Sequence, residues 1–272
     1  MPFILVNGIE SNQPFIQPDA STVTNVYEVV RVQCGVVLFA EDHFHRFCNS
    51  LMIGKQWNEI DFNEWILRIY RVVKGNDIEN SNIRIDHFYH SNGKHDEVIT
   101  PLQAHYPTAE EISQGVSVTL QFDERTNPNA KITDSLLRNK ANNLIVNQKY
   151  YESLLINHHN QITEGSRSNV FAIKNNQLLT APDSMVLQGI MRKKVIESAH
   201  ALSIPVQYEA VDVETISSLN GMFLTGTSPR VLPINSVDEI KVNASHPLIQ
   251  LIRQHVEMLV LNYIEGDKLS KA

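Results

Sequence analysis

Two segments of this 272-residue chain combine a glycine with neighbouring residues in a way that could bind a phosphate group. In 187–192 (LQGIMR), Gly189 directly precedes an apolar pattern that is typical of a helix. The first N–H groups of a helix have no partner inside it, so they point outward and attract anions. In 223–229 (FLTGTSP), a strand pattern ends in a turn whose N–H and hydroxyl groups could bind the same kind of anion. Taken alone, each segment is more typical of an ordinary turn.

A third segment, 162–171 (ITEGSRSNVF), places a carboxylate among small and polar side chains. It lies between two apolar runs that predict strands, so we expect Glu164 to lie on a connecting loop. By its composition alone, this segment indicates a loop and no particular reaction.

The histidines and cysteines do not have the spacing of a metal site. No pair at helical i, i+4 spacing occurs among the histidines that stand close together, which are His87, His90, His95, His158 and His159. We therefore expect solvated histidines and no bound metal. Cys34 and Cys48 are too few for a disulfide framework and too isolated for a zinc site. The motifs GxGxxG, GxxxxGK[ST], HExxH and GxSxG are also absent, which disfavours nucleotide-binding, zinc-protease and serine-hydrolase activities.

Composition excludes several further classes. With 42% hydrophobic and 19% charged residues, the chain is globular and neither disordered nor a coiled-coil rod. Its 23 basic and 30 acidic residues give a net charge of −7, which disfavours nucleic-acid binding. No apolar run reaches the ~18 residues of a membrane span, and the N-terminus lacks the basic start of a signal peptide. We expect a cytoplasmic protein.

The first part of the chain predicts a sheet accompanied by helices. The dipeptides Asn7-Gly8 and Cys34-Gly35 predict the turns of two β-hairpins. Apolar residues in 43–53 recur at spacings of three and four, which predicts an amphipathic helix with Arg46 off its apolar stripe. The further predictions are a helix over 57–73 and strands over 3–6, 27–33, 36–39, 83–89 and 116–122.

The polar segment 123–131 (DERTNPNAK) differs from both its neighbours and contains Pro128, so it predicts a linker. After it, helical and strand patterns alternate. The predicted elements are helices over 134–151, 190–202 and 247–263, and strands over 154–157, 169–173, 177–180 and 222–225 and near 206. The pattern predicts the α/β or α+β class, with a small N-terminal domain over 1–122, a linker over 123–131 and a C-terminal domain over 132–272.

Four motifs occur in order along the chain: YEVVRV…HFHRF, ITEGSRSNVF, VLQGIMR and FLTGTSPRVLPI. Together they resemble the class IV, or fold type IV, aminotransferases, which use pyridoxal 5′-phosphate (PLP). This family includes branched-chain aminotransferases, D-amino acid aminotransferases and aminodeoxychorismate lyases. The resemblance covers roughly 6–233. It implies a two-domain fold like that of D-amino acid aminotransferase, with the cofactor bound by the C-terminal domain.

The resemblance implies a role for each matching residue. Arg46 corresponds to the arginine that pairs with the cofactor phosphate, whose oxygens suit a guanidinium fork. Glu164 corresponds to the glutamate that faces the pyridine nitrogen and favours the protonated ring. Leu187 corresponds to the leucine that packs on the face of the ring. The phosphate would also be held by the backbone N–H groups of Ile190 and Met191 and, from the other side, by Gly226 and Thr227.

The family's Schiff-base lysine stands about 33 residues before this glutamate, at the end of a strand and just before a helix. Counting back 33 residues from Glu164 gives Lys131, which is soon followed by the helix-capping types Thr133 and Asp134. The alternative, Lys140, lies 24 residues before Glu164 and inside a predicted helix, where a lysine extending into solvent is the simpler interpretation. We therefore expect Lys131 to form the Schiff base and to move the substrate proton.

The substrate-contacting positions depart from the family's subgroups. Position 136 is leucine, where branched-chain enzymes usually carry tyrosine. Tyr27 matches the D-amino acid enzymes and, with Ser228, is a candidate substrate contact. Arg84 falls too early in its strand to match the carboxylate-binding arginine of those enzymes. The residues nearer the expected position are His87 and Tyr89.

The resemblance therefore predicts a PLP-dependent aminotransferase that transfers an amino group between an amino acid and a 2-oxo acid. Met191 stands where transaminases commonly have threonine, which leaves a PLP-dependent aminodeoxychorismate lyase as an alternative. An incomplete carboxylate clamp leaves a catalytically silent PLP-binding protein as another. The resemblance also implies a homodimer. The amino donor, the acceptor and the choice between L and D substrates stay open.

Overall fold

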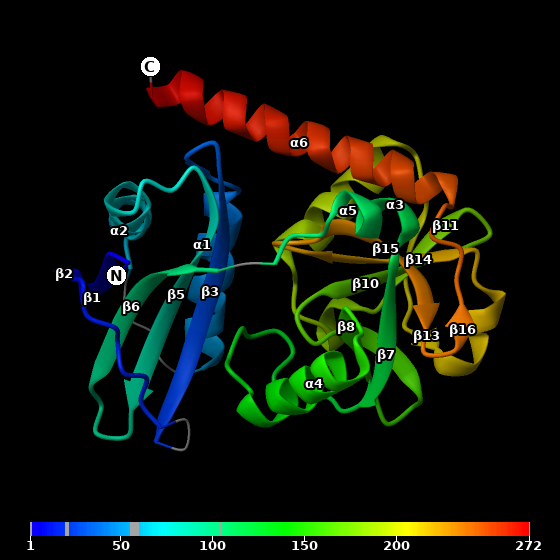
Figure 1. Ribbon diagram of the computed structural model, residues 1–272, viewed down its shortest axis with the longest axis horizontal. Coiled ribbons are helices and arrows are strands. Elements are labelled where there is room, and N and C mark those ends of the chain that lie inside the picture. The colour runs from blue at the N-terminus through cyan, green and yellow to red at the C-terminus, as the bar shows by residue number, and fades with distance from the viewer. Residues whose placement is uncertain (1, 20–21, 55–59, 104, 272) are drawn as a thin grey trace. The chain divides into compact units, whose positions relative to one another are not determined.

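The computed structural model describes residues 2–19, 22–54, 60–103 and 105–271. The chain forms two compact units (Figure 1). Unit 1 comprises Met1–His105, Ala130–Thr133 and Val260–Ala272, and unit 2 comprises Tyr106–Asn129 and Asp134–Leu259.

Unit 1 contains a six-stranded antiparallel sheet with strand order β2-β1-β6-β5-β3-β4. Its strands are β1 (Ile4–Val6), β2 (Ile9–Ser11), β3 (Val23–Gln33), β4 (Val36–Val37), β5 (Asn80–His90) and β6 (His95–Leu102). Both predicted hairpin turns are confirmed. Asn7 and Gly8 have φ of 51° and 74°, and Cys34 and Gly35 have φ of 52° and 73°. Two successive positive φ angles are what a tight two-residue hairpin turn needs.

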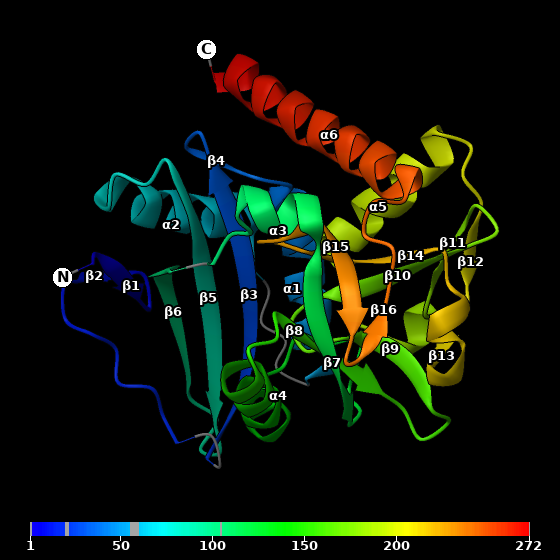
Figure 2. The same ribbon diagram turned by 45° about the vertical axis from the view of Figure 1, so that its right-hand side comes forward.

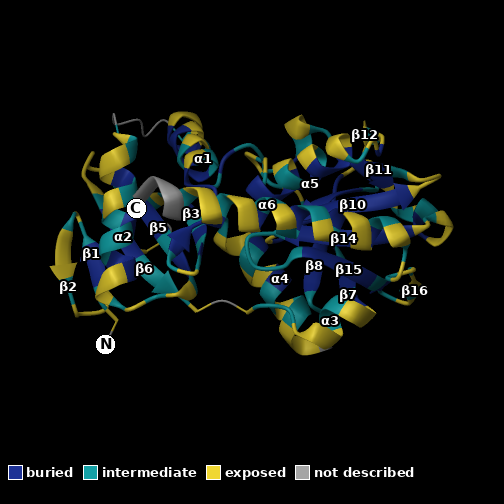
Figure 3. Ribbon diagram, turned by 90° about the horizontal axis from the view of Figure 1, so that it is seen from above, coloured by how far each residue is buried: buried dark blue, intermediate teal, exposed yellow. Residues whose placement is uncertain are grey.

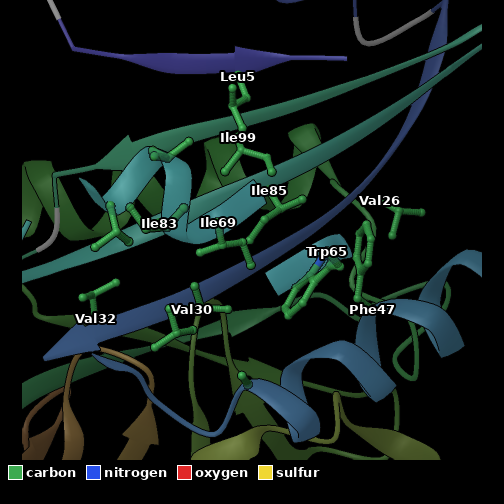
Figure 4. Packing of buried hydrophobic residues seen from close by; sticks show 14 of the residues in the cluster. Leu5, Val26, Val30, Val32, Phe47, Trp65, Ile69, Ile83, Ile85 and Ile99 are labelled. Atoms are coloured by element: carbon green, nitrogen blue, oxygen red, sulfur yellow. The ribbon is translucent and has the colours of Figure 1, made fainter. Parts of the chain in front are cut away.

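Helices α1 (Ala40–Ile53) and α2 (Phe62–Gly75) complete the core of unit 1. Figure 4 shows Phe47 of α1 and Trp65 of α2 among branched aliphatic side chains from the sheet, such as Ile85. The predicted helix over 57–73 starts at a residue outside those that the structure describes. Within them, α2 begins after Asp61, whose side chain accepts a hydrogen bond from the Glu64 N–H.

Unit 2 is built on a ten-stranded sheet in the order β12-β11-β10-β14-β15-β7-β8-β9-β13, with β16 paired to β15. Its strands are β7 (Val116–Phe122), β8 (Glu152–Ile156), β9 (Gln161–Gly165), β10 (Asn169–Lys174), β11 (Gln177–Thr180), β12 (Val206–Tyr208), β13 (Val211–Asp212), β14 (Gly221–Gly226), β15 (Arg230–Val237) and β16 (Ile240–Lys241). Figure 2 shows β10 and β14 side by side within this sheet. Both strands are almost entirely buried, as the dark ribbons of Figure 3 show.

The helices of unit 2 are α3 (Ala109–Gln114), α4 (Ser135–Gln148), α5 (Ile190–Ala201) and residues 247–259 of α6 (Pro247–Lys271), with short 3-10 turns at Asp183–Met185 and Val213–Ser218. Helix α5 packs against β14, whereas α4 packs against β7 and β8. The last turns of α6, from Val260, belong to unit 1. Among the described residues, no helix combines the length and the apolar character needed to cross a membrane.

The mixture of helices and strands confirms the α/β (α+β) class. Strands β6, β9, β13, β15 and β16 and helix α3 were not predicted from the sequence pattern. The expectation that Glu164 lies on a loop is wrong, because Glu164 is the fourth residue of β9 and is buried. Strand β9 carries polar side chains that are nevertheless buried, so it lacks the alternation by which a half-exposed strand is recognised.

The two units divide the chain differently from the predicted division at 122 and 132. Strand β7 pairs with β8 and β15, so residues 106–122 belong to unit 2. Ala130–Thr133 belongs to unit 1 instead, although the chain on both sides of it is in unit 2. The division into domains that fold independently stays a prediction.

Candidate active site

Lys131 lies on unit 1, where its backbone is held at two points. Its carbonyl accepts a hydrogen bond from the Tyr27 N–H at 2.9 Å, and its own N–H donates to Ser50 Oγ at 3.0 Å. A single β-bridge joins the next residue, Ile132, to Val26 of β3. The Lys131 Nζ lies 4.6 Å from the centroid of the Tyr27 ring, at cation–π distance. The backbone contacts therefore fix where this side chain starts, independently of its own conformation.

Lys140, the alternative lysine, is a surface residue of α4. Its side chain is 64% exposed, and its Nζ forms an ion pair with Asp123 at 2.8 Å. An amine in contact with solvent and a carboxylate is kept protonated and is a poor nucleophile. These surroundings favour Lys131 as the catalytic lysine.

Arg46 of α1 lies against a buried carboxylate. Its Nε and Nη2 donate to the two oxygens of Glu28 at 2.9 and 2.5 Å, and His43 Nδ1 lies 3.1 Å from the same carboxylate. Burial opposes a charge on Glu28, but Arg46 and His43 hold the pKa of that carboxyl well below its usual range. Glu28 therefore stays ionised and orients the guanidinium. Ser50 Oγ donates to the Arg46 carbonyl at 2.9 Å, so one hydroxyl contacts the backbone of both Arg46 and Lys131.

The pairing of β3 with β5 decides which β5 residues lie near Tyr27. Side chains directly opposite in an antiparallel pair share a face, and the face alternates along each strand. Tyr27 is opposite Asp86, and Arg84 lies two residues from it on the same face. The Arg84 Cζ is 4.3 Å from the Tyr27 ring centroid, while its fork binds Asp86 at 2.6 and 2.7 Å. Arg84 is thus the β5 cation beside Tyr27, although it falls too early in the strand to match the carboxylate-binding arginine of the D-amino acid enzymes.

The other two candidates for a carboxylate contact, His87 and Tyr89, lie on the opposite face of the sheet. They are paired with Val26 and Thr24, whose side chains point away from the Tyr27 face. The His87 ring lies 6.2 Å from that of Phe47 and 5.3 Å from that of His95. His87 is therefore part of the packing on the helix side, and the expectation that it is a solvated histidine is wrong, because it is buried there. Among the described residues, no group of three His, Cys, Asp or Glu side chains could hold a metal ion.

His87 should make the stability of unit 1 depend on pH. Burial, with the positive charges of His95 and Arg68, lowers the pKa of His87 from 6.5 to about 4. As the pH falls, the unfolded chain therefore takes up a proton at His87 before the folded chain does. The contribution of neutral His87 to the free energy of unfolding is complete above pH 6.5 and is lost as the pH falls to about 4. The loss amounts to about 3 kcal/mol. Chemical unfolding across this range should show a flatter pH dependence for His87→Leu, whereas the exposed His45→Gln should behave like the unmodified protein.

Glu164 is the centre of a second cluster, on unit 2. The Arg125 Nε donates to Glu164 Oε1 at 2.7 Å, and the Leu187 N–H donates to Oε2 at 3.2 Å. Asn169 Nδ2 lies 3.4 Å from Oε2 and donates to the Leu187 carbonyl at 2.8 Å. The structure therefore brings two of the predicted residues, Glu164 and Leu187, into direct contact.

A further buried carboxylate shapes the turn that follows Glu164. Glu152 of β8 accepts hydrogen bonds from the hydroxyls of Ser166 and Ser168 at 2.6 and 2.9 Å and from the Arg167 N–H at 3.2 Å. A side chain at Gly165 would collide with the Ser168 hydroxyl, so this position needs glycine. Glu152 and Gly165 together explain the small and polar residues of this segment.

The N-terminus of α5 has the features of an anion site. Gly189 is its N-cap and supplies no side-chain capping bond, so the N–H groups of Ile190 and Met191 are not capped by that residue. A Cβ at Gly189 would collide with the Asn169 side-chain oxygen, so the close approach of α5 to β10 needs glycine. Arg192 anchors this first turn, because it is buried and donates to the Ala181 carbonyl at 2.9 Å.

The second predicted phosphate turn follows β14. Gly226 is the last residue of β14 and pairs with Arg230 of β15, so Thr227 and Ser228 lie in the connection between these strands. The buried Thr225 hydroxyl, next to this turn, has no hydrogen-bond partner among the described residues. Thr227 and Ser228 are both partly exposed and carry hydroxyl groups that are able to donate.

These two clusters have the chemistry that PLP requires. The α5 N-terminus offers backbone donors for a phosphate without a competing side-chain cap, and Glu164 is a buried carboxylate held by a cation. On unit 1, described by itself, Lys131 carries an amine and Arg46 a guanidinium. Sequence reasoning missed Arg125 and Glu28, and it considered Arg84 but set it aside. Glu28 has a sequence signal, a charged residue on the apolar side of YEVVRV, but Arg125 has none because its contact spans 39 residues.

Comparisons with known proteins agree with this chemistry. The model of the amino-transferase class IV family matches residues 25–237. A Thermotoga maritima protein named "Probable branched-chain-amino-acid aminotransferase" is 30% identical over 251 residues, covering 89% of this chain and 88% of that protein. The D-alanine aminotransferase of Staphylococcus epidermidis is 28% identical over 78% of this chain and 79% of its own.

The fold agrees with a solved structure as well. A branched-chain amino acid aminotransferase from T.th., solved with pyridoxamine 5′-phosphate, superposes with a TM-score of 0.85. The match covers 96% of this chain and 95% of that one at 20% identity, which is evidence for the fold alone.

Proposed function

We propose that this chain, which belongs to the class IV aminotransferase family, uses Lys131 as the lysine that binds its cofactor. The chain has fold type IV and is a PLP-dependent enzyme that transfers an amino group between an amino acid and a 2-oxo acid. The observation that carries the assignment is the placement of Lys131, whose backbone is held by Tyr27 and Ser50 while its amine lies over the Tyr27 ring.

When bound, PLP supplies an aldehyde that accepts the amino group and a ring that withdraws electrons from the substrate. The Lys131 Nζ would take the proton from the Cα of the amino acid and later release it. Glu164 would face the pyridine nitrogen, and Leu187 would pack on the ring. The family motifs, matched along the chain, are the support for assigning these residues to one cofactor.

The phosphate would be bound by charged and backbone donors together. Arg46 brings a guanidinium that Glu28 already orients, and Ile190 and Met191 bring the first N–H groups of α5. Gly226 and Thr227 would add donors from the turn after β14. A dianion is well matched by one cation and several N–H groups, because neither alone would balance the loss of its hydration.

The substrate would contact Tyr27, Ser228 and Arg84. Arg84 is the β5 cation on the Tyr27 face, and it is partly exposed while its fork binds Asp86. We propose that it attracts the substrate carboxylate, a role that the sequence alone did not assign to it. Arg84→Met should therefore raise the amino acid concentration needed for half-maximal reaction by about tenfold, with little change in PLP affinity.

A half-reaction screen tests the function. Purified holoenzyme is mixed with L- and D-amino acids one at a time, and the absorption of the pyridoxal form is followed as it converts to the pyridoxamine form. Conversion by at least one amino acid, with release of the matching 2-oxo acid, is expected. The concentration dependence of this conversion also provides the measurement for Arg84→Met.

The same screen separates the aminotransferase from the lyase. Spectral silence with every amino acid, together with pyruvate release from aminodeoxychorismate, would identify a lyase instead. Silence in both assays, with PLP bound, would identify a PLP-binding protein without catalytic activity. The relatives at 30% and 28% identity are both named aminotransferases, which supports the first outcome.

Assembly and location extend the proposal. We propose a homodimer on the basis of the family resemblance, and sedimentation at micromolar concentration should show it, with loss of PLP favouring dissociation. A fully active monomer with bound PLP would contradict the dimer. A cytoplasmic location stays a prediction from the sequence.

A further inference from the structure

We propose that Arg125 is a positioning residue that keeps the Glu164 carboxylate ionised and aimed at the pyridine nitrogen of the cofactor. This inference rests on the proposed function, because it takes Glu164 as the residue that faces that nitrogen. Arg125 itself would touch neither substrate nor cofactor, and it would act through Glu164.

The guanidinium of Arg125 joins two acceptors of the same strand end. Its Nε donates to Glu164 Oε1 at 2.7 Å, and its Nη2 donates to the Ser166 carbonyl at 2.7 Å. The side chains of Arg125 and Glu164 are only 13% and 3% exposed. A planar fork that binds a carboxylate oxygen and a backbone carbonyl leaves little freedom for the carboxylate to rotate.

The two carboxylate oxygens of Glu164 have different partners. Oε1 receives the charged donor at short distance, whereas Oε2 receives the neutral Leu187 N–H and Asn169 Nδ2 at 3.2 and 3.4 Å. The short contact of Arg125 holds the carboxylate by Oε1. Oε2, with longer contacts to neutral donors, is the oxygen proposed to accept from a protonated ring nitrogen.

The ion pair between Arg125 and Glu164 matters because the Glu164 carboxylate is buried. A carboxylate removed from water favours its neutral form unless a cation or several N–H groups compensate for the lost hydration. A protonated Glu164 could not stabilise a positive ring nitrogen. Since arginine stays charged in proteins, Arg125 supplies a permanent compensating charge.

The segment that carries Arg125 is itself anchored on unit 2. Asp123 forms an ion pair with Lys140 of α4 at 2.8 Å, and Glu124 contacts His158 Nδ1 at 2.8 Å in the turn between β8 and β9. Three consecutive residues therefore contact three different places of the same unit. A segment whose composition indicates a linker thus has the fixed geometry that a positioning residue requires.

The test compares PLP with 1-deaza-pyridoxal 5′-phosphate, in which a C–H group replaces the ring nitrogen. Dissociation constants of both compounds are measured by absorbance for the unmodified protein and for Arg125→Met, Arg125→Lys and Glu164→Gln. The readout is the preference for PLP, defined as the ratio of the two dissociation constants. This ratio reports on the interaction of the protein with the ring nitrogen, and its measurement does not require catalytic turnover.

The unmodified protein should prefer PLP by about tenfold or more, as expected for a charge-assisted contact. Arg125→Met should bring this ratio close to one, and Arg125→Lys should retain part of the preference. A matched control is Arg167→Met, since Arg167 lies three residues from Glu164 but is exposed and contacts Asn142. An unchanged preference in Arg125→Met would overturn the proposal.

Arg125→Met leaves a buried carboxylate without its cation and could impair folding. The double variant Arg125→Met/Glu164→Gln removes that charge. It should show the same preference as Glu164→Gln alone, because Arg125 acts through Glu164, and a further loss would contradict this. If the unmodified protein and Glu164→Gln bind both compounds with equal ratios, the assignment of Glu164 fails, which is a failure of the proposed function instead.

Discussion

Lys131→Ala should abolish the covalent attachment of PLP and reduce transamination on the order of a thousandfold or more, because it removes both the nucleophile and the base. The variant should still fold, since Tyr27 and Ser50 bind the backbone of residue 131 and not its side chain. Borohydride reduction followed by peptide mass analysis is the measurement. It should fix PLP on Lys131 in the unmodified protein and nowhere in the variant.

The matched control is Lys140→Ala, which removes an exposed amine that is paired with Asp123. This variant should retain both the trapped cofactor and the activity. A reduced adduct on Lys140 in the unmodified protein would show that the assignment across residues 123–131 is wrong. It would also remove the observation on which the proposed function depends.

Arg46→Ala should weaken PLP binding and also destabilise unit 1. Loss of a guanidinium contact to a phosphate corresponds to a weakening of about tenfold to a hundredfold. The stability effect has a separate cause, because Glu28 is fully buried and would lose its main compensating charge. Leaving a buried charge unpaired costs about 3–5 kcal/mol. Equilibrium dialysis of PLP and chemical unfolding of the apoprotein measure the two effects.

The double variant Arg46→Ala/Glu28→Gln separates these effects. It removes the unpaired charge, so it should recover most of the free energy of unfolding but none of the PLP affinity. Arg46→Lys should keep part of the PLP affinity and part of the free energy of unfolding. If the double variant bound PLP as tightly as the unmodified protein, Arg46 would serve the Glu28 pair alone and not the phosphate.

Acidification provides an independent check of the Glu28 pair. The pKa of Glu28 in the folded protein lies well below the ordinary value of 4.5, because Arg46 and His43 outweigh the effect of burial. Its contribution to stability is therefore complete above pH 4.5 and is lost as the pH falls toward the folded-state value. Glu28→Gln should remove this part of the pH dependence.

Much of the local structure could be predicted because it depends on neighbouring residues. The turn at Asn7-Gly8 needs two residues that tolerate positive φ, and these two residues adopt it. The apolar spacing in 43–53 places one face of α1 in the core. Four short motifs also indicate the family, and their order along the chain does not depend on any coordinate.

The pairs that organise the site were decided by the tertiary structure. Arg84 and His87 both lie on β5, and only the register with β3 puts Arg84 beside Tyr27 and His87 on the other face. Arg125 contacts Glu164 across 39 residues, from a segment whose composition indicates a linker. Composition and periodicity describe what each residue prefers locally. Which buried charges meet depends on strand pairing and on the cost of leaving either charge alone, and both are properties of the folded chain.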